Sequence, residues 1–423
     1  MYWLVENDEQ LNVLINSGFD EAFIEVIPSN NTIHPSLNHV SLLYIRPINA
    51  TKGFMLCIEH SESLNSITTN YNDLLKKFKV LYCRDKKELL HYLPLKTLYD
   101  INKPPTTYIQ PTTPTHELYY RNHSDNPQLN KIIPIVKHYE VCEQIFEDLK
   151  NNINTKKTKY DEFFNSRVSL VFNAIERSGI RVHVPRFEEY FHPIDGERVY
   201  TQYNLKTLTT RPSNKFKGVN YAALNKENGC RKCFIPHNDS LIEIDISAYH
   251  PSLSCSLIGY NFPTVDIHEH FKTLYKVDYK KSKELTFKQL YGGVFKQYEH
   301  LEYFKKIKEY VGKIWKEFES VGFIECPVSG FIYRKDELNN MNPQKLFNYV
   351  LQNLETSTNV LILWDIFCLL KGKKTKLVLY TYDSFLFDFA EDEGYILEEI
   401  KDIFKKKKLN IKQTEGYDYN FAG

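Results

Sequence analysis

The feature that most constrains this chain is a strand that ends in an acid. In the stretch Leu241–Leu253, apolar and β-capable residues run into Asp245, and small residues and a proline follow at once. A second strand-like run, Lys376–Asp388, places Asp383 at a turn between two apolar blocks. Alone, Asp245 could simply cap the next helix. Two carboxylates from distant strands, however, can hold two divalent cations roughly 3.5–4 Å apart, so the sequence predicts one site built from both.

Length and composition limit the class of protein. A chain of 423 residues is too long for one ordinary core, which predicts two or three domains, and a hydrophobic share of 42% excludes a largely disordered protein. The net charge of +1 does not by itself indicate a nucleic-acid-binding protein, so any basic groove must come from an uneven distribution of charged residues over the surface. The eight scattered cysteines suit a reducing compartment, and no stretch of about 18 apolar residues is present. We therefore expect a soluble, cytoplasmic protein with no membrane partner.

The hydrophobic pattern divides the chain into a small domain and a larger one. Residues 1–100 alternate short apolar runs with helix-compatible stretches, as in a small α/β domain. Residues 151–159 are polar and lysine-rich, which indicates a linker, and an amphipathic helix follows over 160–179. Between the two acid-bearing strands, residues 265–323 are almost wholly helical in pattern. This order predicts a sheet interrupted by a helical insertion.

One helix of that insertion carries a cation and two rings on a single face. Lys283, Phe287 and Tyr291 are four residues apart, so they lie one above another. An incoming nucleotide needs an ammonium for its phosphates and flat rings for its sugar and base. The plainer interpretation is that the rings belong to the core and the lysine is solvated.

Several further short motifs accompany these residues. They are 175–182 (Ile-Glu-Arg-Ser-Gly-Ile-Arg-Val), Thr210-Arg211-Pro-Ser213, Asp266-Ile-His268, the continuation of the helix into Gly292, and Asn348-xxx-Gln352. In this order, from about Tyr160 to the C-terminus, they resemble the motifs of family A DNA polymerases, the group of bacterial DNA polymerase I and its phage relatives. The resemblance implies a phage or viral replicase, located in the host cytoplasm.

The resemblance also implies residue roles. Asp245 and Asp383 would be the catalytic acids and, with Ile246, the site of two Mg²⁺ ions, Mn²⁺ being possible. The implied nucleotide-binding residues are Lys283, Phe287, Tyr291, His268, His250 and Lys280. The implied DNA-binding residues are Arg211, which reads the primer-template minor groove, Asn348 and Gln352 near the nascent pair, Tyr382 and Gly292.

Three departures from the family pattern concern the site. His250 stands where the family has a Glu that blocks ribose 2′-hydroxyls, and we expect imidazole bulk to gate the pocket instead. Tyr279 stands where a fingers arginine is expected, so Lys280 or Lys281 would supply the charge, less well because an ammonium is a point donor. Tyr382-Asp383-Ser384 replaces His-Asp-Glu, so the third carboxylate is absent and catalysis is expected to depend on the pair.

The thumb and the N-terminal domain depart further. A helix pair of useful length cannot be built between Val182 and Arg211 at about 1.5 Å per residue, so we expect a missing or vestigial thumb, a weak and salt-sensitive grip on DNA, and a protein partner that supplies processivity. The N-terminal domain takes the place of the family's 3′→5′ exonuclease. Its first strand carries one acid, Glu25, with Asp85 and Asp100 as remnants of others, which favours an inactive platform for DNA or a partner.

The resulting hypothesis is an α/β and α+β protein. It comprises a ribonuclease H-like exonuclease-type domain (1–150), a connecting segment (151–186), an antiparallel palm (187–264 and 341–423) and helical fingers (265–340). Its expected function is template-directed DNA polymerisation on a primer-template with deoxynucleoside triphosphates. Two alternatives stay open: a family B polymerase, because residues 245–252 and Tyr382-Asp383-Ser384 also echo that family, and a catalytically inactive nucleic-acid-binding protein of a replication complex.

Overall fold

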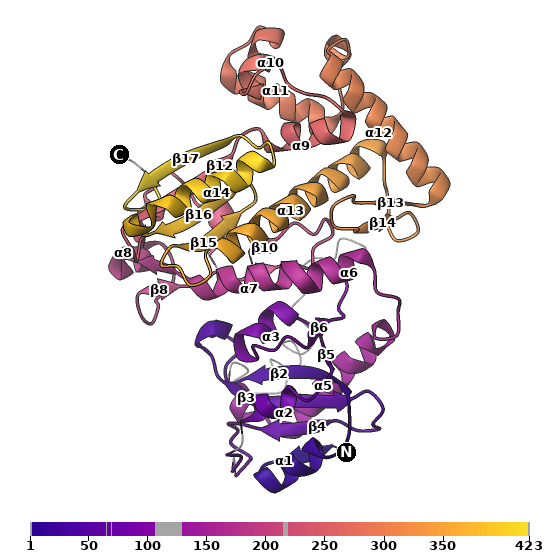
Figure 1. Ribbon diagram of the computed structural model, residues 1–423, viewed down its shortest axis with the longest axis vertical. Helices are drawn as coiled ribbons and strands as arrows, with labels where there is room; N and C mark the ends of the chain where they lie inside the picture. The colour runs from indigo at the N-terminus through magenta and orange to yellow at the C-terminus, as the bar shows by residue number, and fades with distance from the viewer. Residues whose placement is uncertain (1, 65, 69, 106–128, 215–218, 422–423) are drawn as a thin grey trace. The chain divides into compact units, whose positions relative to one another are not determined.

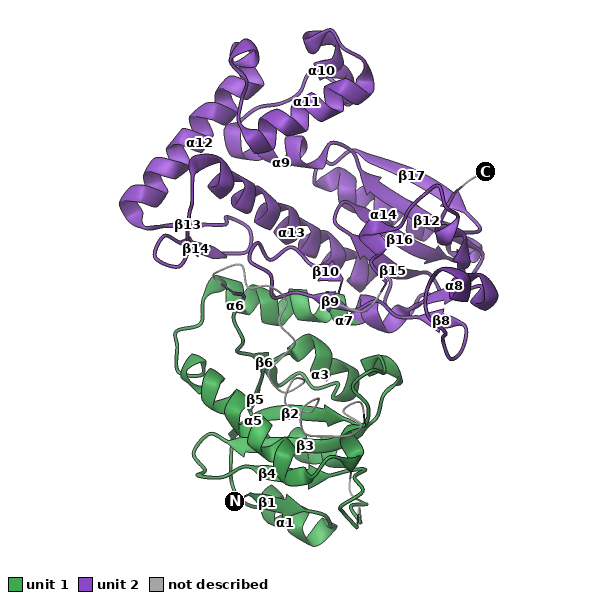
Figure 2. Cartoon of the chain, turned by 180° about the vertical axis from the view of Figure 1, so that it is seen from behind, with its two compact units in different colours: residues 1–103, 109–173 green, residues 104–108, 174–423 purple. Residues whose placement is uncertain are grey.

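The computed structural model describes residues 2–64, 66–68, 70–105, 129–214 and 219–421 (Figure 1). The chain forms two compact units, residues 1–103 with 109–173 and residues 104–108 with 174–423 (Figure 2). The first unit thus continues past residue 150, and helix α7 (Ser169–Ser178) is divided between the two. The finer predicted limits of palm and fingers stay predictions.

The first unit is built on a six-stranded mixed sheet in the order β1-β4-β3-β2-β5-β6. β2, β3 and β4 pair antiparallel, whereas β5 is parallel to β2, β6 to β5 and β1 to β4. The strands are β1 (Trp3–Val5), β2 (Glu21–Pro28), β3 (Val40–Pro47), β4 (Phe54–Cys57), β5 (Val80–Cys83) and β6 (Leu98–Asp100).

Helices cover both faces of this sheet. Alternate residues of β2 enter different cores, because strand side chains point to opposite faces. Ile24 and Val26 join a cluster with helices α1, α2 and α3, while Phe23 and Ile27 join one with α5. These helices are α1 (Asp8–Ile15), α2 (Tyr71–Leu75), α3 (Lys86–Tyr92) and α5 (Ile135–Leu149), and α6 (Lys159–Phe163) follows. The α/β character predicted from the alternating apolar runs is confirmed.

The second unit contains an antiparallel sheet in the order β15-β16-β12-β17. Its strands are β12 (Ser240–Ile246), β15 (Lys376–Thr381), β16 (Ser384–Phe389) and β17 (Ile411–Gly416). Helices α13 (Pro343–Leu369) and α14 (Gly394–Lys406) lie along it (Figure 1). Phe385 of β16 packs on Phe404 of α14 with ring centroids 5.1 Å apart, and Asn359 of α13 donates to the Tyr380 hydroxyl of β15. Both helices therefore cover one face of the sheet.

A helical insertion separates β12 from β15, as the hydrophobic pattern predicts. It contains α9 (Tyr249–Ile258), α10 (Ile267–Tyr275), α11 (Tyr279–Gly292), α12 (Glu302–Val321), the hairpin β13 (Phe323–Glu325) and β14 (Ile332–Arg334), and then α13. An aromatic cluster of Phe262, Phe271, Tyr303 and Phe304 joins α10 to α12, with ring centroids 5.0 to 5.5 Å apart. This packing holds α10, and α11 beside it, at the upper end of the unit (Figure 1).

The segment that precedes the sheet contains only short elements. After β7 (Ile180–Val182), residues 183–210 form α8 (Val184–Tyr190), β8 (Arg198–Val199) and β9 (Tyr203–Asn204). β10 (Ser213–Asn214) and β11 (Phe234–Ile235) complete the unit. Among the helices that the structure describes, none combines the length and apolarity needed to cross a membrane.

Candidate active site

Two carboxylates meet where neighbouring strands end. The register pairs Asp245 of β12 with Ser384 of β16, the residue directly after Asp383. The Ile246 amide donates to the Asp383 carbonyl over 2.9 Å, which ties the two chain segments together. Burial and repulsion by Asp383 raise the pKa of Asp245 to about 6, and burial also raises the pKa of Asp383. Neither side chain has an ion pair with a residue that the structure describes. Among the described residues, the charges of Lys283 and Arg211 therefore oppose these rises from a distance and form no ion pair with either acid.

The turn that presents Asp383 is held in a strained conformation. Tyr382 has φ +59, a region that non-glycine residues rarely adopt. Asn359 of α13 donates to the Tyr382 carbonyl and the Tyr380 hydroxyl, 2.7 Å each, and accepts from the Tyr249 hydroxyl at 2.7 Å. The Arg211 guanidinium lies over the Tyr382 ring, 3.7 Å from its centroid. Strain that the surroundings over-determine is typical of functional sites.

Lys283 and Tyr291, on the predicted face of α11, interact electrostatically with Asp245 and Asp383, respectively. The rings of Phe287 and Tyr291 stack with centroids 5.7 Å apart and planes 9° apart. Phe287 is half-buried and Tyr291 is 37% exposed, so neither belongs to a closed core. Lys283 is exposed, makes no ion pair in the described part of the chain, and its charge opposes the rise in the pKa of Asp245. A cation and two rings thus remain available to a ligand.

His268 lies beside this face with unused hydrogen-bonding groups. The centroid of its ring is 5.6 Å from that of Phe287, and its side chain is only 4% exposed, yet neither ring nitrogen has a hydrogen-bond partner among the residues that the structure describes. Burial and then the Lys283 charge lower its pKa. Asp266 accepts from the Glu269 amide at 2.9 Å and so caps α10. A buried polar group without a partner points to a ligand or water at that position.

Tyr279 and the two lysines after it lie at the start of α11, where the resemblance led us to expect an arginine. The Tyr279 hydroxyl donates to Asp266 over 3.4 Å, and its ring meets His268 edge-on. Lys280 is exposed at the start of α11, and Lys281 pairs with Glu284 at 3.2 Å. Of the two lysines, Lys280 therefore has the freer ammonium.

Three of the predicted DNA contacts lie on α13 and at the end of α11. Asn348 donates to the Tyr291 carbonyl over 3.1 Å, and its side-chain oxygen has no partner in the described part of the chain. Gln352, one helical turn later, is half-buried, and Gly292 is exposed at the end of α11. Ile246 is 1% exposed, so its side chain belongs to the core and only its main-chain carbonyl could serve a metal ion.

A polar network that the sequence did not reveal connects Tyr291 of α11 to Arg211 through two buried residues. His250 hydrogen-bonds the Tyr291 hydroxyl through Nδ1 at 2.5 Å and Glu355 through Nε2. Glu355 is 1% exposed, and its other oxygen accepts from Arg211 Nη2 at 3.1 Å and Nε at 3.2 Å. Glu355 and Asn359 lie on the α13 face of Asn348 and Gln352, at helical spacing, which is the one signal that could have indicated them.

The donor set suits a hard divalent cation. Two carboxylates that form no ion pair within the described ranges provide oxygen ligands, and Mg²⁺ is commonly held by one or two carboxylates together with substrate phosphates. No group of three or more His, Cys, Asp or Glu side chains in the described ranges could hold an ion. A metal here would therefore need ligands from a bound substrate or from water.

Asp245 is buried beside Asp383, so replacing its charged carboxylate with a neutral group should raise the free energy of unfolding at neutral pH. Because the pKa of Asp245 is raised in the folded state, that state binds its proton more tightly, and the free energy of unfolding falls as pH rises from about 4 to about 6. Asp245→Asn should therefore raise Tm at pH 7.5 by about 2–4 °C, a gain of about 1 kcal/mol after allowance for partial exposure, and not at pH 4. Thermal unfolding without divalent ions measures this; a lower Tm at pH 7.5 would show a structural role.

Comparison with known proteins supports a polymerase fold. No protein-family model matches the chain, and no curated protein matches it in sequence. Among solved structures, the POL domain of Pol1 from M. smegmatis, in complex with DNA primer-template and dNTP, matches with a TM-score of 0.68 and 11% identity, over 100% of both chains. At that identity the match shows the fold of a polymerase domain.

Proposed function

We propose that this chain is a template-directed DNA polymerase that adds deoxynucleotides to a primer 3′ end. The observation that carries the proposal is the placement of Asp245 and Asp383 at the ends of neighbouring strands, without an ion pair among the described residues, and with Asp245 within electrostatic reach of the exposed Lys283 of α11. That arrangement occurs in a chain with the fold of a polymerase domain. The primer 3′ oxygen would attack the α-phosphorus, and pyrophosphate would leave.

The acids and the helix face have separate tasks in this reaction. Asp245 and Asp383 would hold two Mg²⁺ ions, or Mn²⁺, which when bound activate the attacking oxygen and stabilise the leaving pyrophosphate. Lys283 would neutralise triphosphate oxygens, and the unpartnered nitrogens of His268 would bond them. The stacked rings of Phe287 and Tyr291 offer a surface for the nucleotide, and Lys280 adds charge at the start of α11.

The primer-template would lie against α13 and the β15–β16 turn. Asn348 has an unpartnered oxygen there, and Gln352 and Gly292 border the same region. Arg211, stacked on Tyr382, already has a planar guanidinium at the site. These residues would contact the nascent pair, and because phosphate contacts dominate affinity, binding should weaken as salt rises.

The first unit is proposed to be an inactive exonuclease-like domain. Five strands of its six-stranded sheet, in the order β4-β3-β2-β5-β6, follow the order of a ribonuclease H-like sheet, and β1 is added beside β4; this order supports the assignment. Its candidate acids already have protein partners: Glu25 pairs with Arg84 at 2.8 Å, Asp85 caps α3 by accepting from the Glu88 amide at 3.0 Å, and Asp100 accepts from the Lys86 amide at 3.0 Å.

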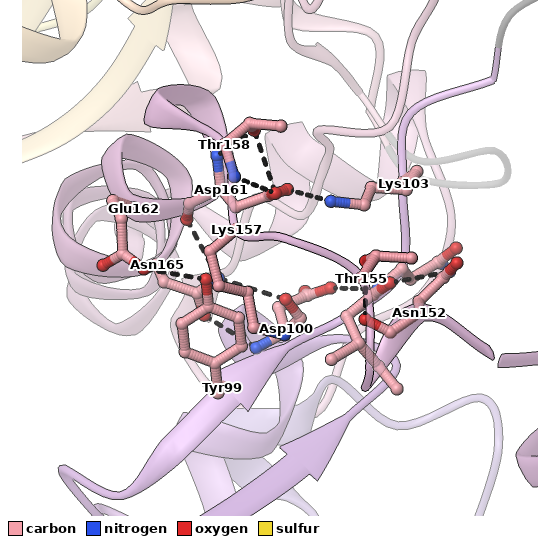
Figure 3. Close-up of polar contacts among 12 residues, drawn as sticks. Tyr99, Asp100, Lys103, Asn152, Thr155, Lys157, Thr158, Asp161, Glu162 and Asn165 are labelled. Carbon is pink, nitrogen blue, oxygen red and sulfur yellow. Dashed lines mark hydrogen bonds and ion pairs between the residues drawn. The ribbon is translucent and has the colours of Figure 1, made fainter. Parts of the chain in front are cut away.

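The polar contacts around Asp100 bind the end of the sheet to the helices that follow. The Asp100 amide donates to Asn165, and Asn165 donates back to the Asp100 carbonyl (Figure 3). Asp161 forms the cap of α6 with Thr158 and pairs with Lys103. These carboxylates thus stabilise the first unit, which favours a binding platform over an editing site.

A protein partner for DNA grip is part of the proposal. Between residues 183 and 210 the longest helix has seven residues, too few for a helical thumb that wraps a duplex. We expect a second protein to supply the missing contacts and hence processivity.

Primer extension distinguishes this function from an inactive polymerase-fold binding protein. The purified chain should lengthen a labelled primer on a template in the presence of Mg²⁺ and four deoxynucleoside triphosphates. Binding of the same duplex without any extension would instead support the inactive alternative. A scaffold has no need for two mutually repelling carboxylates, which argues against that alternative.

A further inference from the structure

We propose that Glu355 is a positioning residue for sugar selection, acting by fixing the ring of His250 against the nucleotide site. The inference rests on the polymerase function proposed above and assigns a role to a residue outside the recognised motifs. Its basis is the series of contacts Tyr291–His250–Glu355–Arg211, of which the two middle residues are buried.

The contacts come from separate elements and hold the His250 ring at both nitrogens. His250 belongs to α9, Tyr291 to α11 and Glu355 to α13. His250 is 7% exposed and Glu355 is 1% exposed, so little water can replace either bond. An imidazole bonded on both sides cannot turn without leaving a buried polar atom unpaired, which costs about 1–3 kcal/mol. The ring is therefore held as a rigid wall.

Glu355 also decides where the ring carries its proton. A carboxylate only accepts hydrogen bonds, so Nε2 must be the protonated nitrogen. In a neutral ring Nδ1 then accepts from the Tyr291 hydroxyl; in a charged ring Nδ1 donates to that oxygen instead. In both states the Tyr291 hydroxyl is fixed to His250, and its ring stays stacked on Phe287.

Arg211 completes the positioning of Glu355. Both guanidinium contacts go to the oxygen that His250 does not use. One carboxylate oxygen thus bonds His250, which is predicted to contact the nucleotide, and the other bonds Arg211, which is predicted to contact DNA. Removing it would free His250 and Tyr291 together, and a 2′-hydroxyl could then enter the space that the ring occupies.

The test compares deoxyribonucleotide and ribonucleotide use. We expect Glu355→Ala to reduce the ratio of kcat/KM for dNTP over rNTP by about tenfold, since pockets reject an added hydroxyl by only about 10². Glu355→Gln, whose carbonyl can still accept from Nε2, should retain more of the ratio. The double variant Glu355→Ala with His250→Ala should have the same ratio as His250→Ala alone, because Glu355 acts only through the His250 ring.

Asp388→Asn is the matched control, because Asp388 is another buried carboxylate of this unit, accepting from the His237 and Asn238 amides at 2.9 Å each. It should leave the ratio unchanged. An unchanged ratio in Glu355→Ala, or a parent that uses both sugars equally, would overturn this inference while extension by the parent upholds the proposed function. A parent that extends no primer would overturn both.

Discussion

Asp383→Asn should reduce primer extension by about three orders of magnitude or more. The change removes one of the two carboxylates that would hold the metal ions, and loss of that stabilisation is worth several kcal/mol in the transition state. Asparagine is nearly the same size, and the turn is held by Asn359 through the carbonyl of Tyr382, so the fold should persist. Single-turnover extension with saturating dNTP measures the loss.

A second measurement on Asp383→Asn separates catalysis from folding. Mg²⁺ should raise the Tm of the parent, because a cation bound to the folded state would offset the cost of burying the two charged carboxylates, whose pKa values burial raises. The same Mg²⁺ should shift the variant much less. Asp388→Asn, in the strand β16 that follows Asp383, should keep its extension rate although it can lose stability. Full activity in Asp383→Asn would contradict the assignment.

Lys283→Ala should lower kcat/KM for dNTP by about 10²–10³-fold, the usual cost of removing one donor aimed at developing charge. Its ammonium has no ion-pair partner among the described residues and already influences both Asp245 and His268. Lys283→Arg should keep part of the activity, because the charge remains while its geometry changes.

The control for this prediction is a lysine five residues further along α11. Lys288 is exposed and pairs with Glu284 at 2.6 Å, so Lys288→Ala should leave kcat/KM within about twofold, as expected for a surface pair worth less than about 1 kcal/mol. Equal losses in the two variants would mean that Lys283 acts only through the general charge or stability of the helix.

Local sequence patterns were sufficient to predict that the two acids follow apolar strand residues and that Lys283, Phe287 and Tyr291 share one helix face. Asp245 ends an apolar strand, Asp383 lies between two apolar blocks, and four-residue spacing defines the α11 face; each signal depends on neighbours in sequence. The helical insertion between the strands followed from the same kind of pattern.

The buried polar network could not be predicted in this way. Glu355 and Asn359 lie in a 27-residue helix dominated by apolar residues, and their partners are distant in sequence: His250 and Arg211 for one, Tyr249 and Tyr382 for the other. Only tertiary packing shows that these polar groups are satisfied. The strained φ of Tyr382 is likewise invisible in a sequence, because nothing about tyrosine favours that conformation.

Template-directed incorporation of a single nucleotide tests the central claim most directly. Four duplexes would differ only in the first unpaired template base, and each would be offered one dNTP at a time with Mg²⁺. If Asp245, Asp383 and Lys283 form a polymerase active site, the parent chain will add the complementary nucleotide to each primer and disfavour the other three. Addition that ignores the template base, or no addition to any of the four primers, would contradict it.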